Sequence, residues 1–335
     1  MDGGNKDDSM TRLSAGCISR FYFLLRPFIS LILLLSGMSL FAAEKIPTHA
    51  IRHLFDIKGT TATPLNLPTD IALTNDRIII VDSGNHRVQV FDPDGGHRFS
   101  IGREGIDKGT FRGPTGVDTD SSGRIYVADS GNNRIQIFDA EGKFLTAFDV
   151  TRKDQLIRPI DVLVHEPQRR VYVSGNTNHR IMGFSIGGYL QVDWGGDGVE
   201  PGAFRYPATM ALMPDKRLAV VDVLNSRVQL FSPAGENPFA VGEWGVLPGQ
   251  LFRPKGVAVN DQGFILVSDS YMGVVQVFTD EGKFITVLGK DGKPQKFRTP
   301  AGLAMDKKQR LFVAEMRANK VSVWQVSPLN KAGAE

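Results

Sequence analysis

The sequence predicts an all-β protein that folds into a six-bladed β-propeller, and three observations lead to this fold class. A pattern of about 46 residues recurs six times after residue 60, which is the period of a propeller or another repeat array. Each unit of the pattern contains four short strand-like runs separated by turn residues. No segment shows a sustained helical period of apolar residues, so the repeat is built from strands.

Two residues mark the same places in the six units. A proline opens each unit, and a basic residue begins the third strand of every unit except unit 5. The opening prolines of units 1 to 6 are Pro68, Pro114, Pro159, Pro207, Pro254 and Pro300. The third strands begin at Arg87, Arg134, Arg180, Arg227, Val274 and Lys320.

Unit 2 shows the four predicted strands most clearly. They are the runs Gly116–Asp118, Arg124–Ala128, Arg134–Phe138 and Lys143–Phe148, and residues typical of turns separate them. Four antiparallel strands per repeat make one propeller blade. Packing between blades buries both faces of a sheet, which explains apolar second strands such as Ile78–Val81.

The last unit lacks a fourth strand, because its pattern stops after Val321–Val326. The run Ala50–Ile57, which precedes the first opening proline, resembles the fourth strand of the other units. We therefore expect Ala50–Ile57 to pair with Val321–Val326 and complete the last blade. A ring closed in this way by an N-terminal strand has no open sheet edge.

The chain divides into residues 1–43, a propeller at residues 44–326 and a disordered C-terminal tail at residues 327–335. Phe28–Ala42 is apolar and uncharged and follows several arginines, which is the pattern of a secretory signal peptide. An uncleaved membrane anchor over residues 21–43 is the alternative. In both cases the propeller is predicted to be exported across the cytoplasmic membrane, to the periplasm or another extracytoplasmic place.

Composition excludes several classes of function. The formal net charge of +3 on 335 residues is too balanced to predict nucleic-acid binding. The only cysteine, Cys17, precedes the apolar run, so the predicted propeller has no disulfide and no thiolate nucleophile. The histidines show no spacing typical of zinc sites, and the sequence points to no catalytic residue.

The motif of unit 2 resembles the NHL repeat. It reads Pro-x-Gly-Val and then Asp-x-x-Gly-x-Ile-Tyr-Val-Ala-Asp-Ser-Gly-Asn-x-Arg-Ile-Gln-x-Phe, and the resemblance is weakest in unit 3. This resemblance implies a six-bladed propeller. NHL propellers include protein-binding scaffolds, RNA-binding domains, extracytoplasmic sensor domains and metal-dependent amidating lyases, so the resemblance does not select a function.

The segment Asp129–Arg134 is either a site of chemistry or a turn that the fold repeats. Its aspartate ends a second strand and its arginine begins a third, and equivalent pairs recur in units 1 and 4. Repetition around a ring favours the structural interpretation, in which the carboxylate caps turn amides and binds the arginine.

The predicted binding residues lie on the rim where these hairpins meet the loops between units. Guanidinium groups suit carboxylate, phosphate or sulfate, and an arginine precedes the opening proline in five units. The hairpins of units 5 and 6 depart from the repeat and place Tyr, Met and Arg on the rim, residue types that often anchor protein interfaces. The predicted residues are Arg112, Arg158, Arg205, Arg253, Arg298, Tyr271, Met272 and Arg317. Pairing of the arginines with local carboxylates, and ordinary surface variation in the hairpins, are the alternatives.

Asp70 and Asp161 stand where the repeat prefers glycine, near the predicted mouth of the central channel. With backbone carbonyls they are weak candidates for a calcium site, although capping a turn or pairing with an arginine is the simpler role. No other metal or cofactor is predicted.

The sequence therefore favours an exported or membrane-anchored propeller that acts as a non-enzymatic scaffold. It would bind a protein or an anionic polymer of the cell envelope through its arginine-rich rim, and it would contact the membrane through an uncleaved N-terminal segment. A metal-dependent lyase or hydrolase with a site at the channel mouth is the alternative. RNA binding is a third interpretation, against which the charge and the export signal both argue.

Overall fold

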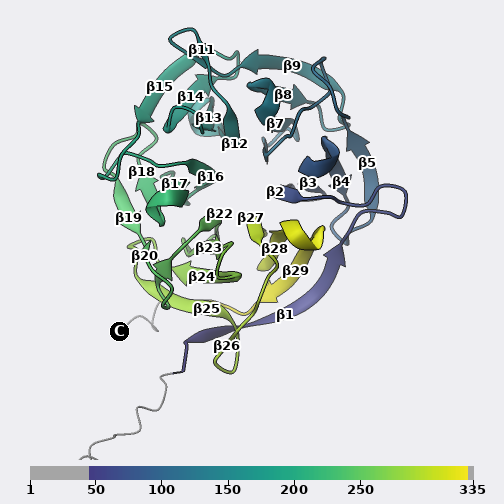
Figure 1. Cartoon of the computed structure of the whole chain (residues 1–335). Helices are drawn as coiled ribbons and strands as arrows, with labels where there is room; N and C mark the ends of the chain where they lie inside the picture. Colours follow the sequence, from purple (N-terminus) through teal and green to yellow (C-terminus); the bar gives the residue numbers. More distant parts are fainter. Residues whose placement is uncertain (1–44, 331–335) are drawn as a thin grey trace, which may run out of the picture. The chain divides into compact units, whose positions relative to one another are not determined.

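The computed structural model describes residues 45–330, which form an all-β propeller with sheets arranged around a central channel (Figure 1). The predicted signal peptide or anchor falls on residues 1–43 and so lies outside the described residues. Between residues 45 and 330, no helix is both long and apolar enough to cross a membrane.

Units 1 to 4 each form a separate four-stranded antiparallel sheet. Unit 1 consists of β2 (Pro68–Leu73), β3 (Ile78–Asp82), β4 (Arg87–Phe91) and β5 (His97–Ile101). Unit 2 consists of β6 (Gly116–Thr119), β7 (Ile125–Asp129), β8 (Arg134–Phe138) and β9 (Phe144–Asp149). Unit 3 consists of β12 (Pro159–His165), β13 (Arg170–Gly175), β14 (Arg180–Ser185) and β15 (Leu190–Gly195). Unit 4 consists of β16 (Pro207–Leu212), β17 (Leu218–Asp222), β18 (Arg227–Phe231) and β19 (Phe239–Val241).

Units 5 and 6 share one nine-stranded sheet, because β1 (Thr48–Ile57) pairs with both. Unit 5 consists of β22 (Pro254–Val259), β23 (Ile265–Asp269), β24 (Val274–Phe278) and β25 (Phe284–Lys290), with β26 (Lys293–Pro294) beside β25. Unit 6 consists of β27 (Pro300–Met305), β28 (Arg310–Glu315) and β29 (Lys320–Val326). Four units are therefore separate four-stranded sheets. Strand β1 joins units 5 and 6 by pairing with β25 on one side and with β29 on the other.

The predicted closure by an N-terminal strand is confirmed. Strand β1 pairs antiparallel with β29, from Ile51 opposite Val326 to Ile57 opposite Val321. Its first residues pair parallel with β25, with Thr48 opposite Val287. Both outer edges are therefore hydrogen-bonded, and neither offers a free edge for association with another chain.

Short elements complete the ring. Two small ladders lie in the loops between units, formed by β10 (Thr151–Arg152) with β11 (Gln155–Leu156) and by β20 (Glu243–Trp244) with β21 (Gln250–Leu251). Five single 3-10 turns follow strands of the sheets: η1 (Ser83–Asn85), η2 (Ser130–Asn132), η3 (Glu166–Gln168), η4 (Val223–Asn225) and η5 (Met316–Ala318).

The core lies between neighbouring sheets. Apolar side chains of β3 and β7, such as Ile79 and Val127, pack into one cluster between units 1 and 2. The tail differs from its prediction, because Leu329 is 1% exposed and packs in the cluster between units 5 and 6. Burial of one leucine side chain is worth about 2 kcal/mol, so the described part of the tail belongs to the propeller.

Candidate functional site

The hairpin carboxylate of unit 2 has a structural role. Asp129 is 0% exposed, and its Oδ2 accepts hydrogen bonds from Arg134 Nε at 2.8 Å and from Gln136 Nε2 at 3.1 Å. Its Oδ1 accepts the backbone N–H of Arg112 at 2.8 Å. The predicted ion pair is present, but the carboxylate holds the incoming loop rather than the amides of its own turn, because the loop amides have no strand partner.

The same carboxylate position organises other units. Asp82 pairs with Arg87 at 2.6 Å and Asp222 with Arg227 at 3.0 Å. Unit 3 has Gly175 at this position. Three equivalent Asp–Arg pairs among the described units fit a structural device of the fold, in which each carboxylate is already hydrogen-bonded.

The five predicted rim arginines do not converge on one site. Arg205 Nε lies 3.6 Å from Asp197, and Arg158 Nε donates to Ser130 Oγ at 3.1 Å, as the alternative interpretation proposed. The side chains of Arg112, Arg253 and Arg298 are exposed and make no ion pair among residues 45–330.

One depression gathers four of the eight predicted binding residues: Arg253, Tyr271, Met272 and Arg317. We call it the cationic groove. It encloses about 1020 Å³ over units 4, 5 and 6, where loops between units meet hairpins between second and third strands. Its other lining residues include Tyr206, Leu224, Phe252, Lys255, Lys296, Phe297 and Thr299.

The unusual hairpin of unit 5 creates the aromatic part of the groove. Because Val274 replaces the arginine of other units, Asp269 accepts the backbone N–H groups of Tyr271 at 3.0 Å and Met272 at 2.9 Å instead. Tyr271 is thereby held outward and is 69% exposed. Its ring lies 4.4 Å from the ring of Phe252, centroid to centroid, so the two form a rigid aromatic pair.

The charge of the groove is entirely positive. Arg253, Lys255, Lys296 and Arg317 line it, and no aspartate or glutamate does. Burial lowers the pKa of Lys255, and the neighbouring Arg253 lowers it further. Four cations without a carboxylate partner make a favourable place for an anion.

Three carboxyl groups line the central channel: Asp70 and Asp161 are buried, and Asp118 is half-buried. Oδ2 of Asp70 accepts the backbone N–H of Val117 at 2.9 Å, and Oδ2 of Asp161 accepts that of Met210 at 2.7 Å. Asp118 binds Val164 N of unit 3 in the same way at 2.7 Å. Each carboxyl group therefore ties its inner strand to that of the next unit.

The pKa values of the channel carboxyl groups are raised above the ordinary value for aspartate. Burial raises the pKa of Asp70 to about 7 and that of Asp118 to about 7, and it raises the pKa of Asp161, with the charge of Asp70 adding to the effect. Oδ1 of Asp161 is buried and has no hydrogen-bond partner among residues 45–330, which also disfavours its charged form. Among residues 45–330, no three His, Cys, Asp or Glu side chains gather in a way that could hold a metal ion.

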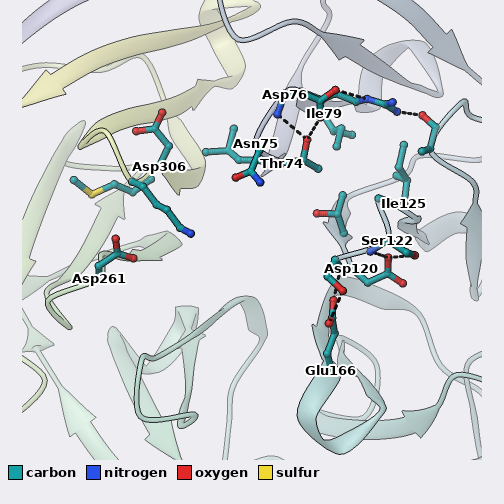
Figure 2. A pocket seen from close by; sticks show the side chains of 18 residues that line it. Thr74, Asn75, Asp76, Ile79, Asp120, Ser122, Ile125, Glu166, Asp261 and Asp306 are labelled. Atoms are coloured by element: carbon teal, nitrogen blue, oxygen red, sulfur yellow. Dashed lines mark hydrogen bonds and ion pairs between the residues drawn. The ribbon is translucent and has the colours of Figure 1, made fainter.

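The opposite mouth of the channel is acidic. Figure 2 shows the depression there, with Asp76, Asp120, Glu166, Asp261 and Asp306 around its rim. It encloses about 650 Å³ and is lined by turns between first and second strands. Most of these carboxylates have local partners; Asp306, for example, pairs with Arg310 at 2.7 Å. The two faces of the ring thus differ in charge, since the same inner strands run from a cationic mouth to an acidic one.

Sequence reasoning missed Lys255, Phe252 and Asp118. Lys255 follows an opening proline directly, at a position where the other units have Thr, Ile or Ala, and this difference was a usable signal. Phe252 is visible only through its contact with Tyr271. Asp118 stands four residues after its proline, where the other units have Ala or Leu, and this difference was also a usable signal.

Comparison with known proteins supports the repeat and the fold. Residues 65–91, 111–138 and 253–278 match the NHL repeat family. Among curated proteins, none matches the sequence.

Solved structures resemble the chain in fold at low sequence identity. A streptogramin B lyase is 13% identical with a TM-score of 0.58, covering 83% of this chain and 98% of the lyase. A gluconolactonase of Xanthomonas campestris is 15% identical with a TM-score of 0.58, covering 84% and 97% of the two chains. A Bacteroides thetaiotaomicron protein of unknown function is 16% identical with a TM-score of 0.62, covering 83% and 76%.

These likenesses show the fold and carry no activity to this chain. The repeat matches, the closed ring of sheets and the structural neighbours agree with one another: the chain is a β-propeller protein that contains NHL repeats.

Proposed function

We propose that this protein is a non-enzymatic binding scaffold, exported across the cytoplasmic membrane, whose cationic groove binds an anionic protein or polymer of the cell envelope. One observation carries the proposal. The groove combines four cations with exposed aromatic surface and has no carboxylate among its lining residues. Interface cores are typically rich in Tyr, Phe, Met and Arg, and hot spots concentrate in Tyr, Trp and Arg.

The roles within the groove follow from its geometry. Arg253 and Arg317 have free guanidinium forks for carboxylate or phosphate groups, whereas Lys296 Nζ already donates to the Met272 carbonyl at 2.9 Å. The pair of Tyr271 and Phe252 offers a flat apolar surface beside those charges. A ligand that fits carries negative charge and apolar groups side by side.

In the test, the full chain is titrated with poly-L-glutamate and with polygalacturonate, and binding is measured by calorimetry at several salt concentrations. The double variant Arg253→Ala/Arg317→Ala is expected to bind at least about tenfold more weakly, because each charge-assisted hydrogen bond contributes about 1.5–3 kcal/mol. The matched control is Arg112→Ala/Arg298→Ala, which removes two equally exposed rim arginines outside the groove and is expected to bind within about twofold of the parent. Equal losses in both double variants, or no binding of either polyanion by the parent, would contradict the proposal.

A metal-dependent lyase or hydrolase with a site at the channel mouth is the second candidate, because Asp70, Asp118 and Asp161 line the channel, although they do not gather as a set of metal ligands among residues 45–330. The names of a streptogramin B lyase and a gluconolactonase among the structural neighbours are compatible with it. It requires a cation between these carboxyl groups, and calorimetry with calcium alone tests that requirement. Calcium binding by the parent, lost in Asp70→Asn/Asp161→Asn, would favour this candidate over the scaffold.

A further inference from the structure

The loop between units 4 and 5 exposes an apolar tip beside the groove. We call residues 243–250, Glu-Trp-Gly-Val-Leu-Pro-Gly-Gln, the apolar loop. Trp244 is 71% exposed, Val246 59% and Leu247 63%. No charged residue interrupts the run from Trp244 to Gln250. Exposed apolar surface of this size usually marks a site of contact with a partner or a membrane.

The apolar loop is held in shape by its own hydrogen bonds. Its two ends pair as β20 and β21, with Glu243 opposite Gln250. Gln250 N donates to the Leu247 carbonyl at 2.9 Å, and Leu247 N donates to Gln250 Oε1 at 3.2 Å. The turn is therefore ordered. The Trp244 ring lies 6.3 Å from that of Phe252, centroid to centroid, and still leaves most of its surface exposed.

The equivalent loops between other units are different. The loop between units 1 and 2 exposes only Ile106, next to Asp107 and Lys108. The loop between units 3 and 4 exposes Val199, between Asp197 and Glu200, and, seven residues further on, Tyr206. A scattered apolar residue among charges is ordinary for a protein surface, whereas three exposed apolar residues in one short loop, with Glu243 as its only charge, are not.

The next connection along the ring, between units 5 and 6, is basic. Lys290, Lys293 and Lys296 are all exposed there. Both connections run from the outer strand of one unit to the inner strand of the next, so they lie on the same face of the ring, and Figure 1 shows β20 and β26 at neighbouring places on its edge. An aromatic and aliphatic tip next to a basic loop is the combination that favours an anionic lipid surface.

The N-terminal end of the described chain lies at the same edge. Gly292 N donates to Thr48 Oγ1 at 2.9 Å, and Lys45 lies against Gly292. The apolar run Phe28–Ala42 ends three residues before Lys45, a span of at most about 10 Å. In the sequence, the predicted signal peptide or anchor therefore directly precedes the strand that contacts the basic connection.

We propose that the apolar loop inserts Trp244, Val246 and Leu247 into the interfacial layer of an anionic bilayer, with Lys290 and Lys293 against the headgroups. A stable peripheral attachment generally needs two signals, and apolar insertion with basic contacts supplies them. This inference goes beyond the proposed function, because the cationic groove can bind its ligand whether or not the apolar loop contacts lipid.

The chain's three tryptophans permit a direct test. Trp194 is 8% exposed, and Trp324 packs between His53 and Phe297, so Trp244 is the exposed probe. The full chain is combined with vesicles of equal parts phosphatidylglycerol and phosphatidylcholine whose acyl chains carry bromine, a quencher of tryptophan fluorescence. The parent is expected to be quenched, and Trp244→Phe is expected to lose most of the quenching. No quenching of the parent, or equal quenching in Trp244→Phe, overturns the proposal.

Two further variants separate insertion from other contacts. Val246→Ser/Leu247→Ser is expected to reduce the quenching of Trp244 at least about twofold, because the two side chains lose their apolar gain in the bilayer. Ile106→Ser/Val199→Ser, which changes the equivalent loops, is expected to leave it unchanged. A thermal unfolding curve for each variant verifies folding. Unchanged quenching in Val246→Ser/Leu247→Ser would refute the inference, because anchorage through residues 21–43 would then be the only lipid contact.

Discussion

Replacing Asp70 by asparagine should alter how stability depends on pH. The pKa of Asp70 is about 7, against an ordinary value of 3.8, because burial disfavours its charged form. The folded protein therefore keeps a proton that the unfolded chain releases above about pH 4. The free energy of unfolding must then fall as the pH rises from about 4 to about 7, and the pKa difference corresponds to about 4 kcal/mol.

Asparagine cannot ionise, and its Oδ1 can still accept the N–H of Val117. The variant should therefore lose less stability than the parent between pH 5 and pH 8. For a domain of this size the difference amounts to roughly 7 °C in the midpoint of thermal unfolding. Asp118, whose pKa is also about 7, remains in the variant and keeps part of the pH dependence.

The assay is thermal unfolding of the parent, Asp70→Asn and the exposed control Asp94→Asn at both pH values. A variant with the same pH dependence as the parent would refute the argument from burial. Addition of calcium at pH 8 gives a second result. If calcium stabilises the parent but not Asp70→Asn, the channel carboxyl groups hold a cation, and the metal-dependent candidate gains over the scaffold.

Two further predictions concern the fold. Asp129→Ala leaves Arg134 without its carboxylate and should lower the free energy of unfolding by about 3–5 kcal/mol in urea titrations, whereas Asp94→Ala on the surface should change it by less than about 0.5 kcal/mol. A similar small change in both would mean that the hairpin carboxylates do not hold the loops. Gly256→Ala places a Cβ onto the backbone oxygen of Ala301 and should lower the free energy of unfolding by about 2–3 kcal/mol in the same urea titrations. The control is Gly187→Ala, whose Cβ makes only ordinary contacts. Equal stability of the two variants would contradict the close approach of the inner strands.

Most of the fold could be predicted from the sequence, because each unit repeats the same markers. In unit 2 the observed β6, β7, β8 and β9 begin and end within one residue of the predicted strands. The pairing of Ala50–Ile57 with the last strand could be predicted because the pattern lacked one strand at its end. What the repeat could not show was the sharing of β1 between β25 and β29, since pairing across neighbouring units leaves no periodic signal.

The candidate site was only partly predictable. Tyr271 and Arg317 could be singled out because they break the repeat, but their meeting in one groove depends on the backbone path of three loops. Arg205 shows the limit of the argument. It stands two residues before its opening proline, as Arg112 and Arg298 do, but only Arg205 pairs with a carboxylate of its own loop, Asp197, in the part of the chain that the structure describes. Nothing periodic distinguishes a free arginine from a paired one.

The channel carboxyl groups were also only partly predictable from the sequence. The register of β2 shifts between Pro68 and Ile71, and that of β12 shifts between Pro159 and Asp161, whereas β6 pairs without a shift. Distance from the opening proline therefore does not indicate which side chains reach the next inner strand. Asp118 stands four residues after its proline and Asp70 two, yet both accept an N–H of the next inner strand.

The closure of the ring by β1 also sets an order of events during folding. His49 Nε2 and the Ser327 carbonyl, 2.9 Å apart, are separated by 278 residues of chain. Strand β1 is synthesised before the other strands of the propeller but finds its partner β29 only after all of them have been made. Loop closure over such a span is slow compared with pairing inside a unit. The early units can form while the ring is still open, and the edges of β25 and β29 stay exposed to other chains until the last step. Chaperone dependence during biogenesis is the expected consequence.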